Sequence, residues 1–182
     1  FVELGFCIVI TQFASHEWAG LYLDDSGFIS GDERARQRLI SLGRLVFKWY
    51  ACASIIFVLL VGGGGYLFLS QSPDLGISWK GPWFSLMVVA GLQLWALPFL
   101  SLLEGCNQVH TIYRFRFVQG VFISLAMWMA MSLDFGLWMA IAGVGAGLIA
   151  TLYLILIVYR KFFQPFFYLQ AGAGNSLERS EE

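Results

Sequence analysis

Residues 49–70 read WYACASIIFVLLVGGGGYLFLS and contain no Asp, Glu, Lys, Arg or His. The same is true of residues 83–103, 117–133 and 135–159. A membrane-spanning helix needs about 20 apolar residues, within a range of roughly 17 to 25, and each of these runs fits that window. A core helix of a water-soluble protein would carry a charged stripe over such a length. The runs therefore predict four membrane-spanning helices.

The composition of the whole chain agrees with this prediction. Of 182 residues, 58% are hydrophobic and 13% are charged, and the mean hydropathy is +0.71. Water-soluble domains carry roughly 25% charged residues, so this chain lacks the material for a solvated surface. The net charge is −1 and the Lys and Arg residues are spread along the chain, which argues against a nucleic-acid partner. We expect an all-α integral membrane protein built as a multi-span helical bundle.

The two ends of the chain differ from the four runs. Residues 1–14 are apolar but too short to span a membrane, and they include Glu3. We interpret them as part of a fifth span rather than a signal peptide, because no basic segment precedes them. The expected bundle covers residues 1–163. Residues 164–182 include AGAGNS and an acidic end, and this composition predicts a disordered tail on the cytoplasmic side.

Basic residues alternate between the connections and predict the orientation of the bundle. The first, third and last connections carry several, namely Arg34, Arg36, Arg38, Arg44 and Lys48, then Arg114 and Arg116, then Arg160 and Lys161. The second connection has only Lys80, and the fourth, around Asp134, has none. Cytoplasmic connections carry an excess of Lys and Arg. We therefore expect the N-terminus of this chain outside and its tail in the cytoplasm.

Residues 31–46 predict a short amphipathic helix on the cytoplasmic side. Ser30 and Glu33 have the spacing of a capping box, which would start a helix at residue 31. Apolar residues then fall on one face and basic residues, Arg34 and Arg38 among them, on the other. Such a helix is expected to lie at the headgroup boundary. The basic residues either fix the topology, which we favour, or hold anionic head groups of lipid or substrate.

Three features predict irregular or close helix packing inside the membrane. Residues 62–65, which are Gly62, Gly63, Gly64 and Gly65, weaken the helix and predict a bend or a close contact. Pro98 removes a backbone hydrogen bond and predicts a kink. Gly143 and Gly147 form a G-x-x-x-G face that lets another helix approach closely. Such irregularities suit a transporter that moves between two packings, but they also occur in static bundles.

The densest polar cluster lies between the third and fourth predicted spans. It contains Glu104, Asn107, Gln108, His110, Tyr113, Arg114 and Arg116. Glu104 could pair with Arg114 or with a basic residue of another connection and so hold one side of the bundle closed. The alternative is a solvated loop with weak local ion pairs. No phosphate-binding loop, catalytic constellation or metal-site spacing is present in the sequence, so we expect no cofactor and no metal.

Three stretches resemble the N-terminal half of a known transporter family. They are Glu3-Leu4-Gly5 with Gln12 and the residues after it, GDERARQRLI at residues 31–40, and Leu103-Glu104-Gly105 with Asn107, Gln108, Tyr113 and Arg114. The start of the last span at Gly136-Leu137-Trp138 is also similar. The family is that of the oligosaccharide flippases, which export O-antigen and other polysaccharide precursors, within the multidrug and oligosaccharidyl-lipid exporter superfamily. The likeness runs from the end of span two to span six, although residues 17–29 are longer than expected.

The resemblance implies transport without covalent chemistry, so the protein is not expected to be an enzyme. Its substrate would be a lipid-linked oligosaccharide, moved across a bacterial inner membrane by alternating access. Its partners would be membrane lipids, the glycan substrate and a second half of the same protein, without which this half is expected to be inactive. The candidate substrate-binding or gating residues are Glu3, Arg34, Arg38, Glu104, Gln108, Arg114 and Arg116. Alternatives are a cation-coupled multidrug exporter or, ranked lower, a membrane-embedded glycan polymerase or acyltransferase.

Overall fold

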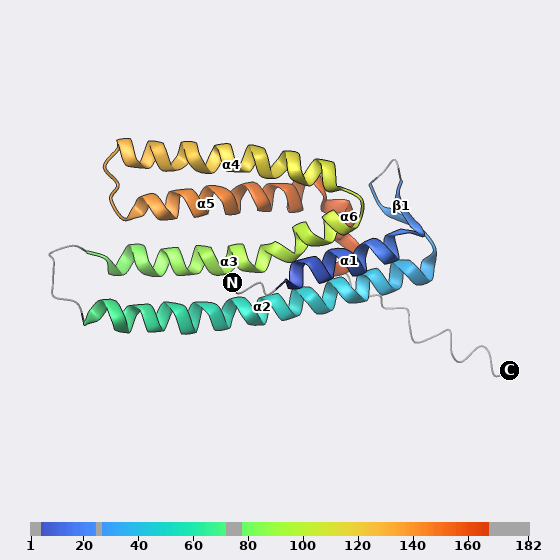
Figure 1. Ribbon diagram of the computed structural model, residues 1–182, viewed down its shortest axis with the longest axis horizontal. Helices are drawn as coiled ribbons and strands as arrows, with labels where there is room; N and C mark the ends of the chain where they lie inside the picture. Colours follow the sequence, from blue (N-terminus) through green and yellow to red (C-terminus); the bar gives the residue numbers. More distant parts are fainter. Residues whose placement is uncertain (1–4, 25–26, 72–77, 168–182) are drawn as a thin grey trace.

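The computed structural model describes residues 5–24, 27–71 and 78–167 (Figure 1). Glu3 and residues 168–182 lie outside the described residues. The elements in chain order are α1 (Phe6–Trp18), β1 (Leu21–Leu23), β2 (Ile29–Gly31), α2 (Glu33–Ser70), α3 (Lys80–Gly105), α4 (Val109–Ser132), α5 (Trp138–Tyr153), the π-helix η1 (Leu154–Val158) and α6 (Arg160–Phe167).

Four of these helices are long and apolar enough to cross a membrane. They are α2, α3, α4 and the continuous run of α5 and η1 over Trp138–Val158. The four predicted spans are thus present as helices, and the fold class of an all-α membrane protein is confirmed. The last predicted span is not uniform, because its final turns widen into η1 before α6 begins.

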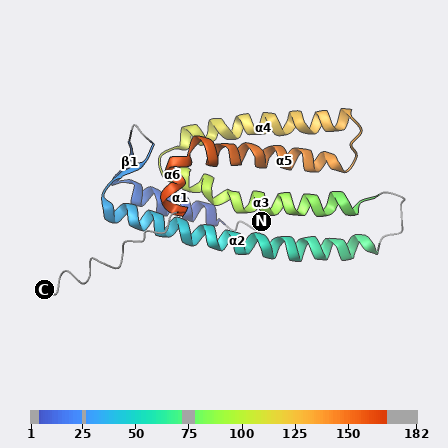
Figure 2. The same cartoon turned by 180° about the vertical axis from the view of Figure 1, so that it is seen from behind.

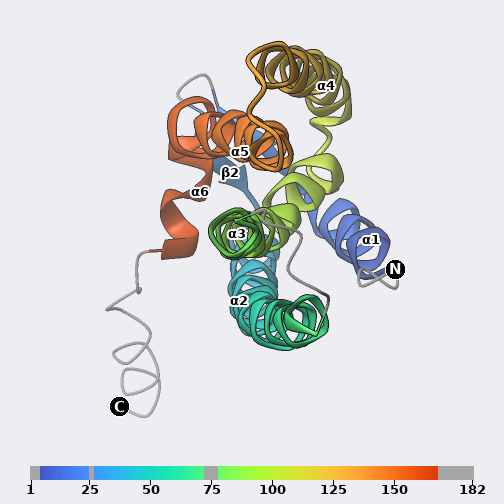
Figure 3. The same ribbon diagram turned by 90° about the vertical axis from the view of Figure 1, so that its left-hand side faces the viewer.

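The helix α3 lies at the centre of the bundle (Figure 3). It packs against α1, α2, α4 and α5, and half of its membrane-length apolar stretch is buried. The apolar stretch of α2 is only 6% buried, so most of it faces outward. Four apolar runs of similar composition therefore occupy different positions, and only the packing distinguishes the central helix from the peripheral ones.

The described residues form two unlike ends. The two strands, α1, α6 and the first half of α2 gather at one end, which we call the hairpin end (Figures 1 and 2). The other end, where residues 133–137 join α4 to α5, we call the turn end. The main cluster of buried residues lies at the hairpin end, and aromatic rings fill much of it. There Phe47 stacks on Phe99 with ring centroids 4.0 Å apart, and Phe162, Phe163 and Phe166 of α6 pack beside them.

The amphipathic helix and the span after it are one continuous helix, α2. Asp32 rather than Ser30 caps it, because the Asp32 carboxylate accepts the backbone N–H of Arg34 at 3.1 Å. The predicted capping box is wrong, since Ser30 belongs to β2. At about 1.5 Å per residue, 38 residues extend over about 57 Å, and a bilayer core of about 30 Å covers only part of that length. The first turns of α2 therefore project beyond the membrane.

The apolar face of this projecting part is covered by protein, not by lipid head groups. Ala35 and Leu39 are buried in the main cluster, and a side chain at Gly43 would overlap Phe166 of α6. The Arg44 guanidinium donates to the carbonyl oxygens of Pro165 at 2.9 Å and Phe166 at 3.0 Å. This face therefore packs on protein, and α6 docks on it at Gly43 and Arg44.

A two-stranded hairpin occupies part of residues 17–31, for which no strand was predicted. Leu21–Leu23 pairs antiparallel with Ile29–Gly31. The Asp24 carboxylate accepts the N–H of Phe28 at 2.8 Å, which closes the hairpin. Gly31 has a φ of 128°, a conformation that favours glycine, and a side chain there would meet the Gly20 carbonyl. Across residues 5–24, 27–71 and 78–167, the regular structure is thus helical apart from this small sheet.

Several of the glycines singled out in the spans lie where two helices pack closely. Gly62 and Gly65 face Met87 and Trp83 of α3, while a side chain at Gly63 or Gly64 would meet nothing within 4 Å. The helix α2 continues through all four glycines. Gly143 and Gly147 of α5 face side chains of α4, namely Met127 and Ile123. The part of α3 that follows Pro98 turns away from the line of its first part (Figure 1).

Candidate functional site

A polar cavity of about 450 Å³ opens between α1, α3 and α4. Its volume is within the range of about 300–1,000 Å³ typical of ligand pockets. The polar residues that line it are Thr11, Gln12, Gln93, Ser101, Glu104, Arg116 and Gln119, and Cys7, Ile8, Leu97 and Leu100 complete the wall. Such a lining is costly within a membrane-spanning bundle and marks a candidate functional site.

Helical spacing brings these side chains to one place. On α3, Gln93, Leu97, Leu100 and Glu104 are three or four residues apart and share one face. The lining residues of α1 and of α4 follow the same spacing within their own helices. The cavity therefore lies where three helix faces meet, each of which carries polar side chains.

An ion pair joins α3 to α4 at one end of the cavity. The Arg116 guanidinium Nη2 lies 2.6 Å from Glu104 Oε1. The Glu104 side chain is only 15% exposed, whereas that of Arg116 is 44% exposed. Glu104 Oε1 is buried and has no further partner among the described residues. The carboxylate is thus balanced by one charge, that of Arg116.

The wall formed by α1 is held closely against α3. The Thr11 hydroxyl lies within hydrogen-bond distance of the Ser101 carbonyl, at 3.1 Å, and of the Cys7 carbonyl, at 2.9 Å. A side chain at Gly105 would meet Ala14 of α1 at 2.5 Å, so only glycine allows this approach. Polar bonding and a glycine contact therefore fix this side of the cavity.

The wall formed by α4 is fixed to α5 by a buried glutamine. Gln119 donates its amide N–H groups to the Gly147 carbonyl at 2.7 Å and to the Thr151 hydroxyl at 2.9 Å. The Thr151 hydroxyl itself donates to the Gly147 carbonyl. A buried amide is stable in such a place only when it is hydrogen-bonded. Gln119 thus connects the cavity lining to the small-residue face of α5.

Gln93 lies near the midpoint of α3 and also lines the cavity. Its Oε1 is buried and has no hydrogen-bond partner among the described residues. An unpaired buried acceptor costs about 1–3 kcal/mol relative to a paired one. Gln93 thus lines the cavity and has an unused hydrogen-bond acceptor among the described residues.

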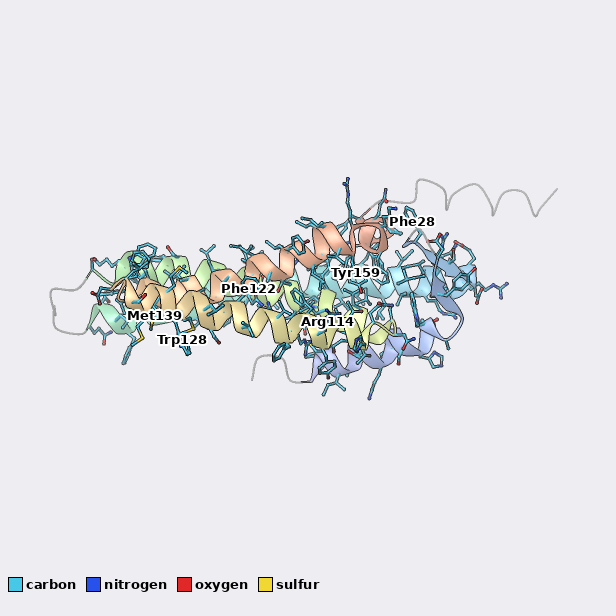
Figure 4. All side chains as sticks on the ribbon, turned by 90° about the horizontal axis from the view of Figure 1, so that it is seen from above. Phe28, Arg114, Phe122, Trp128, Met139 and Tyr159 are labelled. Atoms are coloured by element: carbon cyan, nitrogen blue, oxygen red, sulfur yellow. The ribbon has the colours of Figure 1, made fainter. Side chains whose placement is uncertain are left out.

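Of the predicted site residues, the structure brings together only Glu104 and Arg116. The partner of Glu104 is Arg116, not Arg114, which is exposed and outside the cavity lining. Gln108 accepts a hydrogen bond from the Tyr159 hydroxyl at 3.1 Å and so ties the start of α4 to the end of η1. Figure 4 places Arg114 and Tyr159 toward the hairpin end.

The two arginines predicted on the amphipathic helix also lie apart from the cavity lining. Arg38 pairs with Glu17 of α1 at 2.8 Å, and Arg34 is exposed at the start of α2. The described residues contain no group of three or more His, Cys, Asp or Glu that could hold a metal ion. The structure therefore concentrates the candidate site on Glu104, Arg116 and neutral polar residues.

Sequence reasoning missed the neutral lining residues, above all Gln93 and Gln119. The apolar runs were defined by the absence of ionisable residues. Glutamine is not ionisable, so it did not interrupt them. A search for amides inside the runs would have found both residues, because glutamine is also expensive to bury in hydrocarbon. Comparisons of the chain with protein-family models, with curated proteins and with solved structures gave no significant match.

Proposed function

We propose that the protein is part of a membrane transporter and that the cavity between α1, α3 and α4 belongs to its substrate path. The carrying observation is the polar lining itself, with the Glu104–Arg116 pair in it. Polar groups that face hydrocarbon are expensive, and a static bundle has no use for them at this position. A path for a polar substrate needs such groups, because they replace the water that the substrate loses.

The proposed substrate is a lipid-linked oligosaccharide, in line with the resemblance of residues 31–40 and 103–114 to the oligosaccharide flippases. Hydroxyl groups need amide and hydroxyl partners, which Gln93 and Gln12 provide. A phosphate needs a cation, which Arg116 provides. The full path would form between this bundle and a second one, by alternating access.

The Glu104–Arg116 pair is the proposed gating contact of this transporter. It joins α3 to α4, two helices that otherwise make few contacts with each other. Arg116 is half-exposed, so it can exchange the carboxylate for another anion at low cost, whereas Glu104 is mostly buried. Opening of the pair would let α4 shift relative to α3, while α5 stays packed against both helices.

The proposed location is a bacterial inner membrane, with the hairpin end in the cytoplasm. The support is the excess of Arg and Lys at that end. Ser41→Cys and Ser132→Cys, each in a background without other cysteines, test this with a membrane-impermeant thiol reagent on intact cells. Both serines are exposed, at opposite ends of the bundle. We expect labelling at position 132 alone. Labelling at position 41 alone would reverse the orientation.

The transport proposal is tested by Glu104→Gln, made in the gene in its host. This change keeps the shape of the side chain and removes the charge that balances Arg116. Loss of about 1.4–2.8 kcal/mol of pairing would lower glycan export about 10- to 100-fold. Arg114→Gln is the matched control, because Arg114 is exposed and outside the cavity. Equal export by the two variants at equal protein levels would contradict the proposal.

One observation supports the alternative of a cation-coupled multidrug exporter. Glu104 is the one carboxylate among the described residues that line the cavity, and a carboxylate suits a cationic substrate or a coupling ion. In that case Glu104→Gln would abolish proton- or sodium-dependent dye efflux and leave glycan export unchanged.

A further inference from the structure

The cavity has a charged end and a neutral end. Glu104 and Arg116 form the charged end, near the C-terminal end of α3. Gln93 lies eleven positions earlier on the same helix, and at about 1.5 Å per residue this is about 16 Å along the axis. The two places are too far apart to bind the same small group of a ligand. They call for a ligand with two chemically different parts.

The neutral end lies near mid-depth in the membrane. Gln93 is about 18–20 Å from either end of α3, so a bilayer core of about 30 Å would have its centre close to this residue. An amide at that depth is unfavourable unless its oxygen and its N–H groups are paired. Yet the side chain of Gln93 lines the cavity, and its buried Oε1 is without a partner among the described residues. The molecule keeps an unpaired acceptor where it is most expensive.

The chemistry around Gln93 selects the kind of group that it would bind. The described lining residues other than Glu104 and Arg116 are uncharged, and those nearest Gln93 along α3 are apolar. A charged group would find no counter-charge there, and an apolar group would leave the amide oxygen unpaired. A hydroxyl satisfies both conditions, because it donates one hydrogen bond and carries no charge.

We infer that Gln93 is the specificity-determining contact for an uncharged, hydroxyl-bearing part of the substrate, a saccharide unit, at mid-depth in the cavity. This inference rests on the proposed function. It adds Gln93 as a binding residue and assigns different parts of the ligand to the two ends of the cavity. The neutral end takes the sugar and the charged end takes an anionic group of the same ligand.

The test replaces Gln93 with methionine, which has a similar volume and no hydrogen-bonding group. Initial transport rates are measured with the complete parent transporter in vesicles, with the host's lipid-linked oligosaccharide as substrate. We expect the KM of Gln93→Met to rise about tenfold, the size of one lost hydrogen bond to a buried group, with kcat within about twofold of wild type. Gln37→Met is the matched control, because Gln37 is exposed on α2 and outside the cavity lining. We expect it to keep the wild-type KM.

A second measurement separates the two ends of the cavity. The polyprenyl pyrophosphate without sugar is used as a competitor, and its inhibition constant is compared in wild type and Gln93→Met. We expect no change, because this lipid has no saccharide to reach Gln93. An equal loss for the sugar-free lipid would overturn the assignment, and so would a wild-type KM for Gln93→Met, which would mean that Gln93 binds only water.

The failure of this inference and that of the proposed function give different results. If Glu104→Gln loses transport and Gln93→Met keeps the wild-type KM, only the role of Gln93 is wrong. If neither variant changes glycan transport, the proposed function is wrong. Gln93→Asn gives a second test in case Gln93→Met misfolds, since asparagine keeps the amide but is shorter. We expect its KM to lie between those of wild type and Gln93→Met.

Discussion

The hairpin end and the turn end of this bundle are held together by different means. At the hairpin end, Phe47, Phe99 and the rings of α6 form a closely packed aromatic core. Toward the turn end, large side chains such as Trp128 point outward and the helices touch through glycine. Figure 4 shows Trp128 and Met139 far from Phe28, which marks the hairpin end.

The difference follows from the solvent that surrounds each end. Burial of apolar surface stabilises a protein only where the alternative is exposure to water, as it is for the part of α2 that projects beyond the membrane. In hydrocarbon, exposed Trp and Leu side chains lose nothing, so helices associate by close packing and by occasional hydrogen bonds. Apolar burial therefore stabilises the part of the hairpin end that lies in water, whereas the membrane part depends on close packing and hydrogen bonds.

The largest expected effect is that of Phe99→Ala at the hairpin end. Phe99 is 1% exposed and stacks on Phe47, so its removal leaves a cavity and should lower the free energy of unfolding by about 3–5 kcal/mol. Trp128→Ala, at a ring that is 72% exposed, should change it by less than about 0.5 kcal/mol. Denaturant titration in detergent or bilayers measures both. Equal losses would remove the contrast between the two ends.

Replacement of glycine by alanine should have opposite effects on stability at Gly43 and at Gly120. A side chain at Gly43 would overlap Phe166, so Gly43→Ala should cost about 1–3 kcal/mol by overpacking. A side chain at Gly120 of α4 would meet nothing within 4 Å, and Gly120→Ala should stabilise the helix by up to about 1 kcal/mol. The unfolding midpoints of the two variants should therefore move in opposite directions. A stabilising Gly43→Ala would mean that α6 does not dock there.

The sequence was most informative where hydrophobic length alone decides the outcome. The four runs became helices because their backbone groups must be paired within the segment when no water is available. It was least informative at the hairpin end. There Asp32 caps α2 because Ser30 pairs with Tyr22 in the small sheet, and Gly43 of α2 packs on α6, a segment far away in the sequence.

The candidate site was predicted only in its charged part. Glu104 was singled out, but its partner is Arg116 because helix α4 begins at Val109 and its turns set which arginine faces α3. Gln93 and Gln119 were not predicted, since their role depends on which helices meet in the bundle. That information is not contained in the spacing of one helix.

A smaller effect is expected from the hydrogen bonds that join α4 to α5. Gln119→Leu removes the bonds to the Gly147 carbonyl and the Thr151 hydroxyl, and the bond between those two groups remains. Hydrogen bonds between membrane helices are worth about 0.6 kcal/mol on average and about 1.7 at most, so we expect a loss of about 1 kcal/mol. Thermal unfolding of Gln119→Leu against Ser124→Ala, an exposed site on the same helix, measures it. A loss as large as that of Phe99→Ala would show that the membrane part depends on polar bonds.

The smallest effect is expected at the turn end, where Trp83 of α3 contacts the glycines of α2. Its indole Nε1–H donates to the Gly62 carbonyl at 3.1 Å, and its ring occupies the space beside Gly65. Trp83→Phe removes the donor but keeps an aromatic ring, so about 0.5 kcal/mol should be lost. Trp128→Phe is the control, because that ring faces outward.

A variant of the facing glycine separates the bond of Trp83 from its packing. Gly65→Ala keeps the indole donor but places a methyl group where the Trp83 ring lies, so α2 and α3 must move apart. If close approach is what joins helices in the membrane part, Gly65→Ala should destabilise more than Trp83→Phe in the same unfolding assay. If Trp83→Phe is the more harmful change, hydrogen bonding rather than glycine packing holds the turn end. The two ends would then differ in how far they depend on hydrogen bonds, not in how closely their helices pack.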